Sequence, residues 1–237
     1  MKPNDEWKVL PHGQLTHVAE NLFTVVGKLA MPLGETTRRM TVAKLAGGRL
    51  AIYSAIALVE AEMHRLEALG TPAVLIVPSA IHRIDAKAWK QRYPALVVVA
   101  PPGARDKVAE VVPVDATEID LGDPHVTVDV VPGTDGGELA MLVRAPHAED
   151  RTLVVNDLIF NLPKVPGLAG LGLRLLGFKP GRAAMPTLVR KKLVKDPAAV
   201  KRQLEAWAAM DLDRILPAHG APIDNPRDTL LALAAAA

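Results

Sequence analysis

The 237-residue chain contains no cysteine, which excludes disulfide bonds, thiolate nucleophiles and zinc sites built on cysteine. Aromatic residues make up only 3% of the chain, which argues against the stacking surfaces that bind single-stranded nucleic acid. The charges nearly cancel, with 28 Lys and Arg against 26 Asp and Glu. The net charge therefore gives no reason to expect a nucleic-acid partner.

Long apolar runs are also absent. No stretch of about 18 uncharged apolar residues occurs, and we therefore predict no membrane-spanning segment. The first ten residues, MKPNDEWKVL, are polar and lack the apolar centre of a secretory signal. These absences lead us to expect a cytoplasmic protein. With 49% hydrophobic residues, the chain can form the core of a single domain over residues 1–237.

The pattern of apolar residues predicts two halves, each with strands first and helices after. In the first half, strands are expected over residues 21–27, 36–45, 49–54, 73–77 and 95–100, and helices over 57–69 and 86–92. Gly47 and Gly48 indicate a hairpin turn, and Gly70 ends the first helix. In the second half, strands are expected over 125–133, 138–145, 151–157 and 214–218, and helices over 198–210 and at the C-terminus. This order predicts a duplicated α/β arrangement in which helices cover sheets.

The segment Asn161–Lys195 differs from the rest of the chain. It mixes Gly and Pro with apolar residues and ends in a cluster of four cations between residues 190 and 195. Three interpretations are open: a lid-like insertion, an amphipathic element that touches a membrane surface, or an insertion packed on its own domain with a solvated basic face. Because it begins four residues after Asp157, we expect it to lie beside any site that contains Asp157.

Three potential metal ligands each follow or end a predicted strand. They are His82 after AVLIV, Asp157 at the end of LVVND and His219 after RILPA. Strand ends gather at one rim of an α/β fold, where ligands bind. Two imidazoles and one carboxylate suit catalytic zinc, and they are also the facial set used by non-haem iron. Asp85 is better explained as a carboxylate at the start of helix 86–92.

Several segments together resemble a known family. RLAIYSAI, AVLIVPSAIHRIDA, VVPGTDGG, LVVNDLIF and RILPAHG fall in the order and approximate spacing of the signature segments of the metallo-β-lactamase superfamily, over most of residues 20–220. LVVNDLIF resembles its strand-end Asp motif, and RILPAHG resembles its final Pro-Gly-His-Gly motif. YSAIAL and PSAIHR, with Trp89, Tyr93 and Pro94, resemble a divergent branch of unknown function. The resemblance implies an α/β protein with a four-layer αββα sandwich.

The chain departs from the family in its metal ligands. The main family loop reads His, any residue, His, any residue, Asp, His; the corresponding positions here are Pro78, Ala80, His82 and Arg83. A later family His corresponds to Thr134, and an early family Asp to Ser54. The first metal position is therefore dismantled. The second position remains, with His82 in place of an Asp, together with Asp157 and His219. The resemblance implies one zinc or iron ion bound by these three residues, or none.

Two functions are compatible with this pattern, beside a weaker third interpretation as a membrane-surface protein that uses residues 163–195. The first is a mononuclear metal-dependent hydrolase that acts on a small-molecule ester, thioester, lactone or phosphoester, with Asp157 and His82 as catalytic residues. Apolar residues of the 161–195 segment, such as Leu168 and Leu171, would favour an acyl-bearing substrate, and its cations would favour an anionic group. The second is a catalytically inactive binding or scaffold protein that retains the fold. Measurement of bound metal distinguishes the two.

Overall fold

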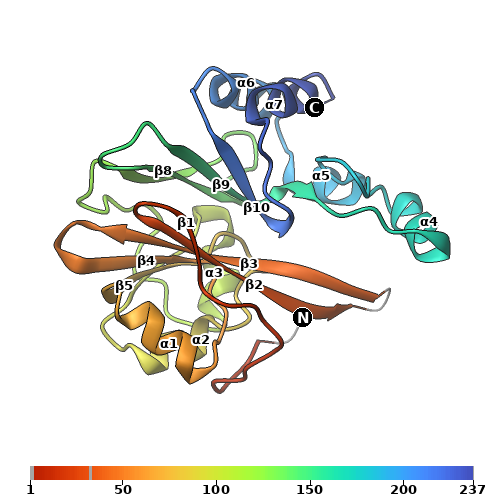
Figure 1. Ribbon diagram of the computed structural model, residues 1–237. Helices are drawn as coiled ribbons and strands as arrows, with labels where there is room; N and C mark the ends of the chain where they lie inside the picture. Colours follow the sequence, from red (N-terminus) through yellow and green to blue (C-terminus); the bar gives the residue numbers. More distant parts are fainter. Residues whose placement is uncertain (1–2, 32–33, 237) are drawn as a thin grey trace.

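Two mixed β-sheets lie face to face and carry helices on their outer faces (Figure 1). The computed structural model describes residues 3–31 and 34–236. The first sheet has the strand order β1-β2-β3-β4-β5-β6, and the second has the order β10-β9-β8-β7. In both sheets, parallel and antiparallel pairs occur together. This is the four-layer αββα sandwich predicted from the sequence.

The first half of the chain forms the six-stranded sheet and its helices. The strands are β1 (Thr16–Ala19), β2 (Leu22–Met31), β3 (Gly34–Leu45), β4 (Arg49–Tyr53), β5 (Thr71–Ile76) and β6 (Val97–Val99). The helices are α1 (Glu60–Glu67), α2 (Ala86–Arg92) and α3 (Arg105–Ala109), with short 3₁₀ turns at Ala46–Gly48 and Pro102–Ala104. The expected turn between β3 and β4 is present, and its Gly47 and Gly48 both have positive φ angles, near 70°.

The second half forms the four-stranded sheet and the remaining helices. The strands are β7 (Val126–Val130), β8 (Leu139–Arg144), β9 (Arg151–Asn161) and β10 (Arg214–Gly220). The helices are α4 (Gly167–Leu175), α5 (Thr187–Leu193), α6 (Pro197–Ala208) and α7 (Pro226–Ala234). Helices α6 and α7 cover the outer face of the second sheet, whereas α4 and α5 extend to one side (Figure 1).

Three apolar clusters fill the three interfaces between the four layers. Alternation along β4 directs Leu50 and Ile52 outward, toward the helices of the first half, and Ala51 and Tyr53 inward, toward the second sheet. The third cluster lies between β9 and β10 on one side and α6 and α7 on the other. Because both faces of each sheet are buried, central strands such as β4 and β5 are apolar at most positions. This explains runs such as AVLIV and TLVV in the sequence.

Helix α1 begins later than the sequence pattern predicts. The prediction started at residue 57, but the chain is extended at Val59 and becomes helical only at Glu60. Ala57 and Leu58 are fully buried, and the carbonyl of Leu58 accepts a hydrogen bond from the Trp7 indole (2.9 Å). Buried residues in an extended segment produce the same apolar pattern as one face of a helix, and this explains the early start that the sequence predicted. Within the described residues, no helix has the length and apolarity needed to span a membrane.

Candidate metal centre

Strand β9 leaves its regular pairing with β10 where it presents Asp157. The two strands pair in parallel register as far as Val155 opposite Pro217, and the pairing resumes only at Phe160 opposite His219. Four residues of β9 therefore face a single residue of β10, which is a larger bulge than the usual two residues against one. The bulge brings the Asp157 side chain, inside β9, beside His219 near the carboxyl end of β10.

The backbone of the bulge is held by one buried carboxylate. Glu138, which immediately precedes β8, accepts hydrogen bonds from the backbone N–H groups of Asn156 (3.1 Å), Asp157 (3.0 Å) and Leu158 (3.1 Å). Its side chain is completely buried. Buried N–H groups without partners are strongly destabilising, so Glu138 supplies the acceptors that these three groups need in the bulge.

Three electron-rich atoms converge from β9, β10 and the loop after β5. The Oδ1 atom of Asp157 lies 3.3 Å from His82 Nε2 and 3.5 Å from His219 Nε2, and the two Nε2 atoms lie 3.3 Å apart. A tetrahedral zinc ion with bonds of about 2.0–2.1 Å requires ligand atoms about 3.3–3.4 Å apart. The three residues therefore match the spacing of a zinc shell. Among the residues described, this is the one group of three His, Asp or Glu side chains so placed.

Each histidine is oriented through its other ring nitrogen. The Nδ1 atom of His219 donates to the backbone carbonyl of Thr37 in β3 (2.6 Å), because a carbonyl can only accept. In a neutral ring, Nε2 then carries the lone pair that a metal ion requires; in a protonated ring, Nε2 donates to Asp157. The Nδ1 atom of His82 lies 2.9 Å from the hydroxyl of Ser54, which can donate or accept. Such partners are typical of metal-binding histidines, since they fix the direction of the ring.

The second oxygen of Asp157 is also fixed. Its Oδ2 atom accepts hydrogen bonds from the Ser79 hydroxyl (3.2 Å) and from the side-chain amide of Asn156 (2.8 Å). The same amide donates to the Ser79 hydroxyl (3.1 Å), so the three side chains form a closed triangle. Oδ1 therefore remains the oxygen that faces the histidines.

Opposing electrostatic effects act on the two carboxylates of the site. Burial acts to raise the pKa of Asp157, but the His82 charge and hydrogen bonds from both histidines hold that pKa well below its usual value. Burial and then the negative charge of Asp157 raise the pKa of Glu138, against its three backbone hydrogen bonds. Asp157 therefore keeps its negative charge. A cation, either a proton or a metal ion, is needed among the three converging atoms.

A buried arginine supports the strand that carries His219. The guanidinium of Arg39 in β3 donates from Nε to the carbonyl of Pro217 (3.0 Å) and from Nη2 to that of Gly220 (2.8 Å). Arg39 is 5% exposed, and burial lowers its pKa to about 10, so it remains charged at neutral pH. Its two hydrogen bonds lie on either side of His219 along β10. They fix the strand where it is no longer paired regularly with β9.

Four further residues correspond to metal ligands of the family: Pro78, Ala80, Arg83 and Thr134. The hydroxyl of Thr134 donates to the carbonyl of Val131 in its own turn (2.7 Å). The guanidinium of Arg83 is directed to Glu110 (3.0 Å). Pro78 and Ala80 have no side-chain donor atom.

Asp85 has a different role from the one expected. It precedes α2, but its side chain makes no capping hydrogen bond to that helix. Instead it forms a buried ion pair with Arg38 (2.7 Å) and accepts a hydrogen bond from Asn4 (2.7 Å). The carboxylate therefore links α2 to β3 and to the N-terminal segment, a contact that local sequence could not indicate.

The segment Asn161–Lys195 approaches His219 through the ring of Phe160. The ring of Phe160 stacks on His219, with ring centroids 4.7 Å apart, and Phe178 packs edge-on against Phe160 at 5.6 Å. However, Leu168 and Leu171, expected to favour an acyl-bearing substrate, are 86% and 51% exposed on α4. They do not line a cavity at the site.

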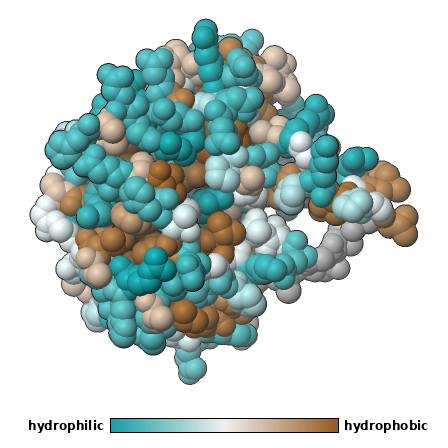
Figure 2. Space-filling view, in the orientation of Figure 1, coloured by the Kyte–Doolittle hydropathy of each residue, from teal (hydrophilic) through white to brown (hydrophobic). Residues whose placement is uncertain are grey.

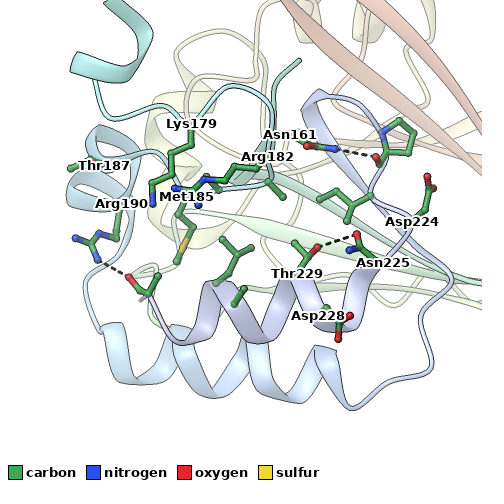
Figure 3. Close-up of a pocket in the computed structure, with 17 residues that line it drawn as sticks. Asn161, Lys179, Arg182, Met185, Thr187, Arg190, Asp224, Asn225, Asp228 and Thr229 are labelled. Carbon is green, nitrogen blue, oxygen red and sulfur yellow. Dashed lines mark hydrogen bonds between the residues drawn. The ribbon is translucent and has the colours of Figure 1, made fainter. Parts of the chain in front are cut away.

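A cavity of about 810 Å³ separates part of this segment from α7 (Figure 3). Lys179, Arg182 and Arg190 contribute cations on one side, and Asp224 and Asp228 contribute anions on the other. None of the three potential ligands lines it. Strand β9 links the cavity to the three side chains, because Asn161 lines the cavity and its neighbour Phe160 stacks on His219.

Two supporting residues, Glu138 and Arg39, were missed in the sequence. The pair Arg38-Arg39 within the strand TTRRMTV was the one available signal, because adjacent charges on opposite faces of a doubly covered strand are unusual. Glu138 gave no signal, since an acid at the start of a strand is ordinarily exposed.

No protein-family model matches this sequence, and no curated protein matches it. Solved structures are similar over nearly the whole chain. The metallo-β-lactamase FIM-1 from Pseudomonas aeruginosa, in its mono-zinc form, is 13% identical with a TM-score of 0.63, covering 97% of both chains. DIM-1 exposed to ceftazidime is 14% identical with a TM-score of 0.64, covering 97% of this chain and 99% of its own. The metallo-β-lactamase from Hirschia baltica is 11% identical with a TM-score of 0.61, covering 94% and 98%.

Proposed function

Because the chain has the fold of the metallo-β-lactamases, we propose that it is a metal-dependent hydrolase with a single ion bound by His82, Asp157 and His219. The observation that supports this most strongly is the spacing of the three ligand atoms, 3.3 to 3.5 Å between each pair. The orientation of each side chain by a further partner adds to it. Zinc and iron both suit two imidazoles and a carboxylate.

The chain's own residues prepare this site in distinct ways. Asp157 stays ionised at neutral pH and so suits the role of ligand better than that of general base. Thr37 and Ser54 fix the two imidazoles, and Phe160 covers one face of His219. A divalent ion held there supplies Lewis acidity and lowers the pKa of water at the site toward neutrality.

We propose an ester, thioester, lactone or phosphoester as the substrate class, since these are bonds that a single Lewis-acidic centre can help water to break. The neighbouring cavity supports a substrate with an anionic group. Lys179 and Arg182 line this cavity, and neither makes an ion pair with any residue that the structure describes. A carboxylate or phosphate would be favoured on the side of the cavity that these cations line, opposite Asp224 and Asp228.

The alternative is a binding or scaffold protein without catalysis. It is favoured by one observation: the three side chains are within hydrogen-bonding distance of one another, at 3.3 Å for two of the contacts. A shared proton could therefore hold the cluster together in place of an ion. In that case His82, Asp157 and His219 would stabilise the fold alone.

Hydrolysis assays with and without metal test the proposal. Chromogenic esters, thioesters, lactones and phosphoesters, each with and without a carboxylate, would be supplied to protein treated with chelator and then reloaded with zinc, iron or manganese. We expect hydrolysis of at least one class that disappears with the chelator, returns with an ion and is lost in Asp157→Ala. A rate that is the same in chelated, reloaded and Asp157→Ala protein would refute it. The matched control is Asp129→Ala, which removes an exposed carboxylate of β7.

A further inference from the structure

The positive charge of the protein is concentrated in one stretch of the chain. Residues 158–195 contain eight of the 28 Lys and Arg and none of the 26 Asp and Glu. The remaining residues therefore carry 20 cations against 26 anions. A segment of about one sixth of the chain is strongly basic, while the rest of the molecule is net acidic. The net charge of the whole chain is near zero and does not show this separation of charge.

These cations are available to an external partner. Seven of the eight are exposed, and Arg190 is partly buried. None of the eight forms an ion pair with any described residue, whereas cations elsewhere, such as Arg92 and Arg214, do. They create a basic surface, formed by Lys164, Arg174, Lys179, Arg182, Arg190, Lys191, Lys192 and Lys195. Lys179, Arg182 and Arg190 also line the cavity opposite Asp224 and Asp228, and the other five lie outside that cavity.

An apolar helix face accompanies the basic surface. Leu168, Leu171 and Leu175 follow one another at helical spacings of three and four along α4, so they share one face. Their exposed fractions are 86%, 51% and 80%, and that of the following Leu176 is 38%. Helix α4 projects from the body of the molecule, and its projecting end is coloured as hydrophobic among hydrophilic neighbours (Figures 1 and 2).

We propose that α4 and the basic surface dock the protein on an anionic lipid bilayer. An amphipathic helix with exposed leucines and surrounding Lys and Arg inserts its apolar face at the level of the headgroups, while the cations contact anionic lipids. A convex, projecting apolar tip suits a deformable lipid surface better than a preformed groove. The protein would bind peripherally, and the inference does not depend on a bound metal.

A second copy of the chain fits the apolar face of α4 less well than an anionic bilayer does. A two-fold contact through α4 would bring the same basic segment of each copy together, because the same patch is used twice in such an interface. Eight unpaired cations on each side would then repel one another. Anionic lipid supplies the opposite charge. Charge complementarity therefore selects the bilayer over self-association.

Vesicle flotation tests this directly on the full chain. Vesicles of phosphatidylcholine alone would be compared with vesicles that also contain phosphatidylglycerol. One variant combines Leu168→Ser with Leu175→Ser, and the other combines Lys191→Glu with Lys192→Glu. Matched controls outside the segment are Leu231→Ser on α7 and the pair Lys201→Glu with Arg202→Glu on α6, which change exposed residues of the same types.

We expect wild-type protein to float with the anionic vesicles and not with the neutral ones. Each segment variant should weaken binding about tenfold or more, and the controls should bind as wild type does. Added salt should weaken binding as well. Three results would overturn the inference: no flotation of wild type, flotation unaffected by both segment variants, or a dimer by light scattering that Leu168→Ser with Leu175→Ser abolishes. Circular dichroism on all variants verifies that they are folded.

Discussion

At the scale of single residues, the position of Asp157 depends on a carboxylate that does not touch the converging ligand atoms. Glu138 accepts three consecutive backbone N–H groups of β9 and is completely buried. A glutamine of the same size has one acceptor oxygen in place of two, and its amide hydrogens would face backbone donors. At least one N–H group would then lose its partner within the core.

Glu138→Gln should therefore lower the free energy of unfolding by about 1–3 kcal/mol, the usual cost of an unsatisfied buried polar group. Metal affinity should also fall, by about tenfold to a hundredfold, because the displaced bulge moves Asp157. Urea unfolding and metal titration measure the two effects. Glu118→Gln, at an exposed position, is the control. Unchanged stability and affinity would mean that the bulge does not require the Glu138 carboxylate.

Asp157 itself gives a pH-dependent prediction for the metal-free protein. Its pKa in the folded protein lies below the ordinary value of 3.8, since the two histidines outweigh the opposing effect of burial. A lowered pKa stabilises the folded state above the unfolded-state value, and that stabilisation is lost as the pH falls. The advantage of wild type over Asp157→Asn in unfolding free energy should thus shrink as the pH falls below about 5, and it should continue to shrink at lower pH. An advantage that stays constant or grows on acidification contradicts this assignment.

At the scale of elements, the site depends on contact between the two sheets as much as on the strands that carry the ligands. Strand β3 belongs to the first sheet, yet its Thr37 carbonyl orients His219, and its Arg39 binds two carbonyls of β10. The register of β10 on β9 shifts between Pro217 and His219. The buried guanidinium therefore holds β10 on both sides of this irregularity.

Arg39→Met keeps much of the side-chain volume but leaves the carbonyls of Pro217 and Gly220 without these donors. We expect a loss of about 2–4 kcal/mol in unfolding free energy, because hydrogen bonds from a buried charged group are among the stronger ones. Arg39→Lys should lose less, since an ammonium group can still reach one carbonyl. Thermal or urea unfolding provides the measurement. An Arg39→Met protein as stable as Arg39→Lys would show that the guanidinium contributes nothing specific.

At the scale of the whole molecule, the sequence predicted the layers because each strand carries its own signal. The runs around β4, β5 and β9 are apolar on both faces, which is how strands covered on both sides are recognised. The three proposed ligands could be named because each follows such a strand. Their common location, within 3.5 Å of one another, follows from the fold.

The remaining features depend on partners far away in the chain. Glu138 is separated from its N–H partners by about twenty residues, and Arg39 from the carbonyls of β10 by nearly two hundred. No local pattern reports such contacts. The same holds for Asp85, expected to serve α2 and found with Arg38, and for the exposed leucines of α4. Sequence composition shows that a segment is apolar, but only the structure shows whether that apolar face is covered.

The central claim is that the protein binds one ion, through His82, Asp157 and His219. Elemental analysis after loading with zinc, iron or manganese tests it most directly, on wild type, His82→Ala, Asp157→Ala and His219→Ala, with His64→Ala, at an exposed histidine of α1, as the control. We predict one ion per chain in wild type and His64→Ala, and stoichiometric binding lost in each of the other three. Two ions per chain, no ion in wild type, or one ion that persists after all three substitutions would contradict the account.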